Sequence, residues 1–140
     1  MIVLDTTYVS LFQHPEDARA SSLRERLIAA PDKDIVTTAI TVEEQMRGWL
    51  SAIHRQQDVH RQVQYYERLV GLFRFFAAWR ILPFDDQAAD MFQSLRGQRI
   101  RIGTMDLKIA SIVLIHDATL LSSNLRDFQK VPGLRVEDWL

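Results

Sequence analysis

The stretch Ile2-Val3-Leu4-Asp5 is a short, β-prone apolar run that ends on a carboxylate. A run that is apolar at successive positions is typical of a strand buried on both faces of a sheet. Similar short runs follow at residues 35–36, 81–84 and 119–122, with a last one at 134–136 after the Pro132-Gly133 turn. Helix-length segments separate most of these runs, which predicts an α/β domain with a mainly parallel, four- to five-stranded sheet.

The segments between the predicted strands carry helix signals. Thr41-Val42-Glu43-Glu44 matches the capping box, and Pro31 stops an earlier helical pattern. We predict helices over residues 17–30, from Thr41 to about His54, over 58–79, from Asp85 or Asp86 to about Arg99, and over 104–116. No repeat, low-complexity stretch or linker interrupts the chain, so residues 1–140 are predicted to form a single domain.

Composition narrows the class of protein. The chain has 140 residues, 47% hydrophobic and 25% charged, as expected for one globular domain. It has no cysteine, which excludes disulfides, thiolate zinc sites and cysteine nucleophiles. No apolar run reaches the roughly 18 residues that span a bilayer, and the first residues lack the pattern of a signal peptide. We therefore expect a soluble, cytoplasmic protein that makes no use of a membrane.

The net charge of −1 hides an uneven distribution. Residues 1–45 hold eight acidic against four basic residues, whereas residues 46–84 hold six arginines against two acidic residues. A third stretch, 93–110, carries Arg96, Arg99, Arg101 and Lys108 against Asp106 alone. Basic stretches of this kind either meet phosphates or form solvated helix faces, and charge alone does not distinguish the two.

Acidic residues recur where predicted strands end or the following helices begin. Asp5 follows the first strand, Glu44 lies in the first turn after the second, and Asp106 lies at a later helix start. Asn124 and Asp127 follow the strand at 119–122. The carboxyl ends of parallel strands share one edge of a sheet, where ligands bind. The topology thus predicts that these side chains converge.

Each acid also has a structural interpretation on its own. Asp5 and Glu44 suit helix caps, Asp106 suits a helix N-terminus, and Asp127 suits a turn. Together, however, clustered carboxylates repel one another, and a hard divalent cation such as Mg²⁺ removes that cost. Such an ion, with its retained water, supports attack on a phosphoryl group. Other sites lack their motifs: there is no phosphate-binding glycine loop, no nucleophile elbow and no HExxH. A haloacid-dehalogenase phosphatase needs a second Asp two residues after the first, and Thr7 occupies that position.

Four segments in register resemble the motifs of PIN-domain proteins, specifically the VapC-type toxins of bacterial toxin–antitoxin pairs. The second motif has its acid four residues before Gly48, at Glu44, and the third reads Asp106-Leu107-Lys108-Ile109-Ala110. The segments are Ile2–Thr7, Ile40–Gly48, Thr104–Ala110, and a closing part that runs through Leu121–Phe128 and Val131–Trp139. The resemblance covers essentially the whole chain.

The resemblance implies a PIN-like α/β/α sandwich, with Mg²⁺ or Mn²⁺ at the acidic rim. It implies endoribonuclease activity on single-stranded RNA, a homodimer, and inhibition by a cognate antitoxin protein. Asp5 and Asp106 would bind the metal directly, with Glu44 as the third acid. Thr6 and Ser122 would support them, although Ser122 stands where the family usually has Thr. Ser123-Asn124 stands where the family often has Asn-Asn or an Asp, so the fourth acid is either Asp127 or absent, and Asn124 is a supporting residue.

Two surfaces follow from the same interpretation. Arg96, Arg99 and Arg101 are candidates for binding RNA phosphates. The segment 65–79 has more aromatic residues than one helical stripe can bury. Leu69, Leu72, Phe73 and Phe76 fit a core stripe, and the surplus favours a partner groove or a dimer face. The family resemblance implies that the antitoxin helix docks on this segment, and the candidate partner-binding residues are Tyr65, Tyr66, Leu69, Phe73 and Phe76.

Two alternatives remain open at this stage. The chain could be a catalytically silent PIN-fold binding module whose acids are helix caps. It could also be a PIN nuclease that acts on DNA or on stable RNA outside a toxin–antitoxin pair. Metal binding distinguishes the first alternative, and growth arrest relieved by an adjacent small gene product distinguishes the second.

Overall fold

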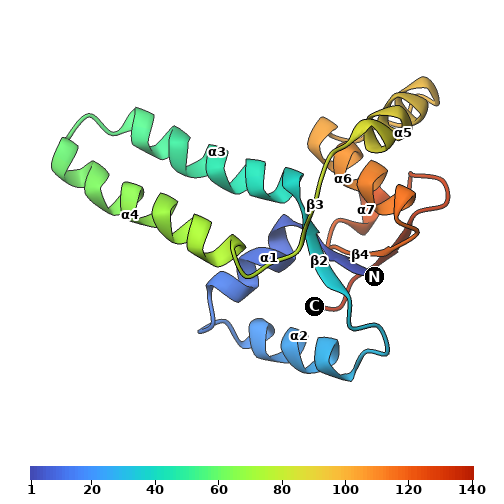
Figure 1. The fold of residues 1–140 in the computed structure, drawn as a ribbon, viewed down its shortest axis with the longest axis horizontal. Coiled ribbons are helices and arrows are strands. Elements are labelled where there is room, and N and C mark those ends of the chain that lie inside the picture. Colours follow the sequence, from blue (N-terminus) through green and yellow to red (C-terminus); the bar gives the residue numbers. More distant parts are fainter.

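The computed structural model describes residues 1–140 in full, as alternating strands and helices (Figure 1). The elements are β1 (Ile2–Leu4), α1 (Thr6–Gln13), α2 (Ala18–Ala29), β2 (Ile35–Thr38), α3 (Ala39–Arg55), α4 (Val59–Phe76), β3 (Ile81–Leu82), α5 (Asp86–Gly97), α6 (Thr104–Ile115), β4 (Thr119–Leu121), α7 (Leu125–Phe128) and β5 (Arg135–Glu137). The predicted strands are confirmed, as are helices within each predicted helical segment.

The five strands form one parallel sheet in the order β3-β2-β1-β4-β5. β1 lies at the centre, with Ile2 opposite both Ile35 of β2 and Thr119 of β4. The predicted fold class, an α/β/α sandwich with a parallel sheet, is confirmed. All five strands end at the same edge, so residues that follow β1, β2 and β4 are brought together there.

The sheet separates two hydrophobic cores. Val3 of β1 faces a core built with α5 and α6, which includes Ile109 and Ile112. Ile2 and Leu4 face the opposite core, built with α1, α2 and α4, which includes Tyr8. Successive side chains of a strand point to opposite faces, so a strand apolar at every position requires helices on both sides.

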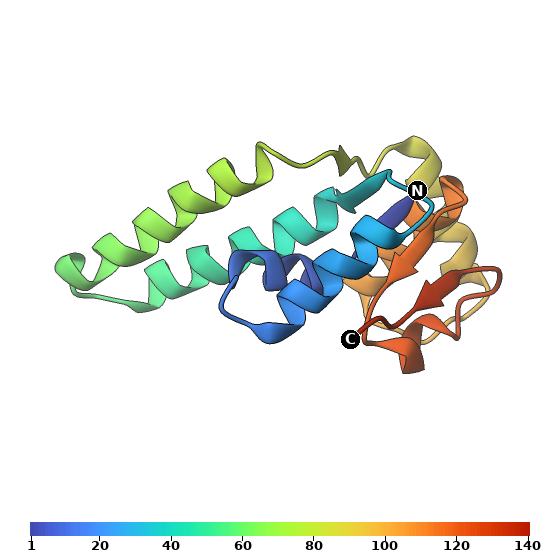
Figure 2. The ribbon, with the colours of Figure 1, turned by 90° about the horizontal axis from the view of Figure 1, so that it is seen from below.

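The hairpin of α3 and α4 projects from the sheet as a long arm (Figures 1 and 2). Its base packs on the sheet through Leu72 and Phe76, which are both buried. No helix combines the length and the apolar character needed to cross a membrane.

Two predicted helix starts are wrong. α3 begins at Ala39, directly after β2, and its cap is Thr38, whose Oγ1 accepts a hydrogen bond of 3.2 Å from the Thr41 amide. Thr41-Val42-Glu43-Glu44 is therefore not a capping box, and the Glu44 side chain is free for another contact. Thr104 does not cap α6 either: Gly103 occupies the cap without a side-chain bond.

Two helices were not predicted. α1 follows β1 without a loop, so its eight residues leave little room for a helical period to stand out from the strand pattern. α7 has only four residues. Both matter to function, because α1 begins directly after Asp5 and α7 carries Asp127.

Candidate metal centre

Asp5 lies at the point where β1 passes into α1. Its main-chain amide continues the sheet, donating to the Leu121 carbonyl over 3.1 Å. Its carboxylate caps α1 by accepting a 2.9 Å hydrogen bond from the Tyr8 amide. The side chain is buried at the sheet edge, with the residue only 8% exposed. Asp5 is thus both a helix cap, as one interpretation expected, and a fixed carboxylate at the edge.

Glu44 extends from α3 toward the start of α1. Its Oε1 accepts a hydrogen bond of 2.9 Å from the Thr6 hydroxyl, whose oxygen also lies 3.2 Å from Thr41 Oγ1. Thr6 is the residue next to Asp5, so this contact ties the second predicted acid to the first. The bond replaces the backbone contact that a capping box would have given Glu44.

Asp106 and Asp127 are joined by Asn124. The Asn124 side-chain amide donates to Asp106 Oδ2 and to Asp127 Oδ2, each over 3.2 Å. The Asn124 main-chain amide donates over 3.0 Å to the hydroxyl of Ser122, which is fully buried. The segment after β4 therefore holds Asp106 of α6 against Asp127 of α7.

The carboxylates divide into two electrostatic classes. Burial is the main cause that raises the pKa of Asp5, Glu44 and Asp106 above the ordinary value. The charge of Asp106 raises the pKa of Asp5 and of Glu44 further, so the three acids share one electrostatic environment. The pKa of Asp127 is instead lowered, first by the Asn124 amide and then by Lys130, whose ammonium lies 3.3 Å away.

The donor set fits a hard divalent cation. Carboxylate, hydroxyl and amide oxygens are the ligands that Mg²⁺ and Mn²⁺ prefer, and a cation would relieve the unfavourable burial of these charges. In the side-chain arrangement of this structure, no three acidic or histidine residues are grouped closely enough to hold a metal ion. In this arrangement Glu44 accepts a hydrogen bond from Thr6, and Asp106 accepts one from Asn124.

The predicted RNA-binding arginines lie at the end of α5 and in the connection that leads to α6. Arg96 is in the last turn of α5, and Arg99 and Arg101 lie in the connection from α5 to α6, which carries Asp106. All three are exposed. The Arg96 guanidinium lies over the Phe92 ring at 5.6 Å from its centroid.

The candidate partner-binding residues do not form one surface. Phe76 is 5% exposed and lies in the core, so the prediction that it binds a partner is wrong. Tyr65 and Leu69 are half-buried, and the Tyr65 ring packs against Trp49 at a centroid distance of 6.2 Å. Tyr66 and Phe73 are 52% and 58% exposed. Phe73 therefore does not belong to the predicted core stripe, whereas Leu72 and Phe76 do.

Tyr66 and Phe73 belong to an exposed stripe that sequence reasoning missed. We call it the outer stripe of α4. Its members recur every three or four residues, the spacing of one helix face, and are Val59, Val63, Tyr66, Val70 and Phe73.

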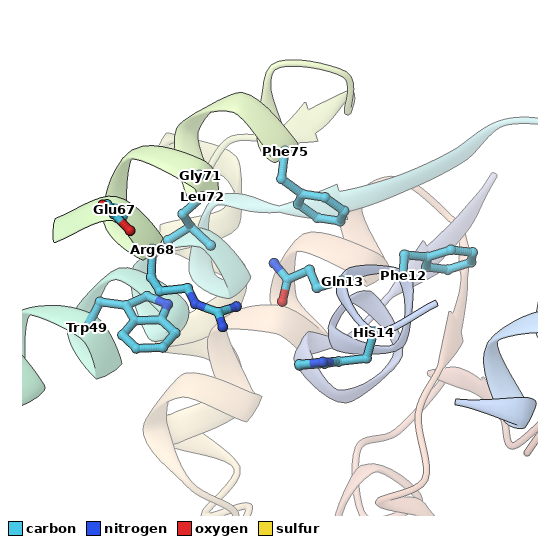
Figure 3. A pocket seen from close by; sticks show the side chains of 9 residues that line it. All are labelled: Phe12, Gln13, His14, Trp49, Glu67, Arg68, Gly71, Leu72 and Phe75. Carbon is cyan, nitrogen blue, oxygen red and sulfur yellow. The ribbon is translucent and has the colours of Figure 1, made fainter. Parts of the chain in front are cut away.

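A second feature missed from the sequence is a pair of hollows around Phe12 of α1. The first, of about 570 Å³, lies between α1 and the α3–α4 arm and is lined by Phe12, Trp49, Arg68, Leu72 and Phe75 among others (Figure 3). The second, of about 480 Å³, is lined by Phe12, Leu27, Ile28, Ile35 and Trp79, with Arg24 and Lys33. We call the two together the Phe12 groove; neither hollow includes a candidate metal ligand.

Comparison with known proteins gives consistent matches. The PIN domain family matches residues 2–134. The chain is 33% identical over 69 residues to the tRNA(fMet)-specific endonuclease VapC of Salmonella typhimurium, covering 46% of this chain and 52% of that protein. It is 40% identical over 60 residues to ribonuclease VapC1 of Rickettsia felis, covering 40% and 45%. The matched segments span about half the length of these relatives.

Solved structures share the fold over the full length. The chain superposes with a TM-score of 0.73 on the structure of VapBC2 from Rickettsia felis bound to a DNA fragment from its promoter, at 23% identity and 100% coverage of both chains. It superposes with a TM-score of 0.69 on FitAcB from Neisseria gonorrhoeae, at 25% identity and coverages of 99% and 98%.

Proposed function

Because this chain belongs to the PIN domain family, which matches residues 2–134, we propose that it is a metal-dependent endoribonuclease of the VapC type and the toxin of a toxin–antitoxin pair. The observation that carries the proposal is the position of the three acids at the carboxyl edge of the sheet: Asp5 ends β1, Thr6 beside it bonds Glu44, and Asn124 after β4 bonds Asp106. The names of the matched relatives, an endonuclease and a ribonuclease, support the same activity.

Mg²⁺ or Mn²⁺ would be held by Asp5 and Asp106, with Glu44 as the third acid. When bound, the ion supplies positive charge for a phosphoryl oxygen of the RNA. Glu44, whose pKa is raised mainly by burial, would accept the proton of the water that attacks phosphorus as the P–O bond to the leaving oxygen breaks. Thr6 orients Glu44 for that step, and Asn124 orients Asp106.

Asp127 would serve as an outer acid. Its carboxylate accepts the Asn124 amide and faces the Lys130 ammonium, so its charge is already balanced. Asp127 thus supports Asp106 through Asn124, while the buried hydroxyl of Ser122 supports the Asn124 main chain.

RNA would approach along the α5–α6 connection. An acidic site repels the phosphodiester backbone, and nearby cations offset that repulsion. Arg96, Arg99 and Arg101 are exposed next to the helix that carries Asp106, so they are our candidates for phosphate contacts.

The antitoxin would cover the Phe12 groove. The groove is concave; its second hollow is mainly apolar, its first is mixed, and Arg24, Lys33 and Arg68 line it against the single acid Glu67. An amphipathic helix with apolar residues on one face and acidic flanks complements that surface. The outer stripe of α4 has a spacing of four and three residues, which suits pairing with another helix. We assign the outer stripe to the homodimer contact, which Tyr66 and Phe73 would make. Tyr65 and Leu69 are half-buried and would stabilise the arm instead.

The test measures cleavage of a single-stranded RNA with Mg²⁺ or Mn²⁺ for the wild type, Asp5→Asn and Asp106→Asn. Both variants should lose at least a hundredfold in rate, because removal of a metal-binding carboxylate removes its charge from the site. Asp117→Asn is the matched control, since Asp117 lies beyond α6 with a positive φ of 49° that Asn tolerates, and its side chain is 91% exposed.

Three outcomes separate the alternatives. Equal cleavage by the wild type and Asp5→Asn would overturn the mechanism. A wild type that neither cleaves RNA nor gains thermal stability from Mn²⁺ indicates a silent binding module. Faster cleavage of a DNA strand of the same sequence indicates a DNA nuclease.

A further inference from the structure

The segment that follows β5 is tied to α1 by a buried tyrosine. Tyr8 is fully buried, and its hydroxyl donates a hydrogen bond of 2.7 Å to Asp138 Oδ1. The same hydroxyl oxygen accepts a bond of 2.6 Å from the Trp139 main-chain amide. Both bonding directions of the phenol are thus satisfied by two adjacent residues. We call Tyr8, Asp138 and Trp139 the clasp.

The clasp reaches the candidate metal centre through Tyr8 itself. The Tyr8 amide donates the 2.9 Å bond that holds the carboxylate of Asp5. One residue therefore binds Asp5 with its main chain and Asp138 with its side chain. Tyr8 therefore links the cap of α1 to the segment that follows β5.

A second connection runs from the clasp to the other half of the centre. The Ser122 amide donates to the Glu137 carbonyl over 3.0 Å, and the Ser123 hydroxyl lies 3.5 Å from Asp138 Oδ1. Ser122 in turn accepts the Asn124 amide, and Asn124 holds Asp106. The segment 137–139 is thus bonded to Tyr8 of α1, which holds Asp5, and to the turn after β4, whose Asn124 holds Asp106.

The Asp5–Leu121 main-chain bond already joins β1 to β4; we propose that Tyr8 and Asp138 are positioning residues that hold the first turn of α1 and the segment Ser122–Asn124 in place beyond that bond, and thereby set the affinity of the acidic site for a divalent cation. The inference rests on the metal site of the proposed function. Neither residue touches the metal: Tyr8 acts through its main chain on Asp5, and Asp138 acts through Tyr8 and Ser123.

The physical basis is the limited tolerance of metal sites for misplaced ligands. Cation ligands must be held within a few tenths of an ångström, and residues that only orient a ligand change metal affinity by about 10- to 100-fold when substituted. Asp5 and Asp106 come from separate elements, so their separation depends on contacts between those elements. The clasp supplies such contacts through a buried hydroxyl, which fixes one geometry.

The test measures the dissociation constant for Mn²⁺ alone by titration calorimetry on the full chain. Tyr8→Phe removes the hydroxyl and keeps the ring, and Asp138→Ala removes its acceptor. We expect each to weaken Mn²⁺ binding about three- to tenfold, less than removal of a residue that bonds a ligand directly, because the effect passes through the backbone. Asp138→Asn keeps an acceptor oxygen for Tyr8 and should restore most of the affinity.

Trp139→Phe is the matched control. It removes the 2.7 Å bond from the indole to Glu137 and keeps the main-chain amide that reaches Tyr8. It should lower the melting temperature without changing the Mn²⁺ dissociation constant. The independent readout is hydrogen exchange of the main-chain amide of residue 8. This exchange should be faster than in the wild type in Tyr8→Phe but unchanged in Trp139→Phe.

The outcomes distinguish this inference from the proposed function. If the wild type binds Mn²⁺ and Tyr8→Phe and Asp138→Ala bind it equally well, the positioning role is overturned while the metal site stands. Weakening by Trp139→Phe to the same extent as by Tyr8→Phe also overturns it, because general destabilisation then explains the loss. If the wild type binds no Mn²⁺, the metal site fails and the inference fails with it.

Discussion

The hydroxyl of Thr6 donates a 2.9 Å hydrogen bond to Oε1 of Glu44, and this bond joins two residues that are 38 positions apart. Thr6 begins α1 immediately after Asp5, and Glu44 lies in α3. The bond lowers the pKa of Glu44 and partly offsets the effects of burial and of the charges of Asp106 and Asp5. Thr6 therefore orients the third acid and opposes the rise in its pKa.

Thr6→Val tests this relationship. Valine keeps the shape of threonine and removes the donor, so the pKa of Glu44 should rise and the acid limb of the cleavage pH profile should move to higher pH. A hydrogen bond to a charged group contributes roughly 1.5–3 kcal/mol, so we expect a rate loss of about 10- to 100-fold near neutral pH. Thr7→Val, at an exposed position of the same helix, is the control and should leave the profile unchanged. An unshifted acid limb in Thr6→Val would contradict the role assigned to Thr6.

The stability of the metal-free protein should depend on the protonation of Asp5. Burial raises the pKa of Asp5 in the folded state, so the folded protein holds this proton more tightly than the unfolded chain does. Stability therefore falls as the pH rises from the unfolded carboxyl pKa, about 3.9, through the raised folded value.

Asp5→Asn removes this titration and still caps α1, because Asn is an equally good cap. In the presence of a chelator it should melt at a higher temperature than the wild type at pH 7, and the difference should disappear below about pH 4. Thermal unfolding of the wild type and of Asp5→Asn from pH 3.5 to 8 measures this difference in melting temperature. Carboxyl groups whose pKa is lowered contribute equally to both proteins, so they do not affect the difference. A difference that stays constant with pH would show that Asp5 carries no destabilising charge.

The two apolar surfaces should respond separately to substitution. Phe73→Lys places a charge in the outer stripe of α4 and should leave the chain monomeric where the wild type forms the proposed dimer, as measured by light scattering during size-exclusion chromatography. Ile28→Lys places the same charge in the Phe12 groove and should weaken binding of the proposed antitoxin, as measured by calorimetry. Ile28 is 69% exposed and Phe73 58%, so neither change disturbs the core.

Each of these variants is the control for the other. Loss of both properties in one variant would show that the two surfaces are a single interface. A Phe73→Lys variant that remains dimeric would exclude the outer stripe from the dimer contact.

Phosphate binding should appear in the salt dependence of RNA affinity. For single strands, each phosphate that a cationic side chain neutralises contributes about 0.7 to the slope of log affinity against log salt concentration. Arg96→Gln, Arg99→Gln and Arg101→Gln should each reduce the slope by about that amount, without dependence on RNA sequence. Arg135→Gln, on the far edge strand β5, should leave it unchanged. Slopes equal to that of the wild type in all three would exclude the α5–α6 connection as the RNA path.

The local sequence pattern did not predict which face of α4 is buried. Phe73 and Phe76 are three residues apart, about 300° around a helix with 3.6 residues per turn, so they lie on neighbouring faces. The sequence put both in one core stripe, yet Phe76 is buried and Phe73 is exposed. α4 carries apolar residues on several faces, so only the position of α3 and the sheet decides which face is covered.

The sequence by itself determined the parallel sheet and the edge at which the acids gather. A strand that is apolar at successive positions must be covered on both faces, and parallel strands end together, so Asp5 and the residues after the strand at 119–121 share an edge. The tertiary structure alone decided the contacts between distant segments: Thr6 with Glu44, Asn124 with Asp106, Tyr8 with Asp138, and the groove around Phe12. Those contacts depend on how separate elements pack in space, and local hydrophobic periodicity carries no record of that packing.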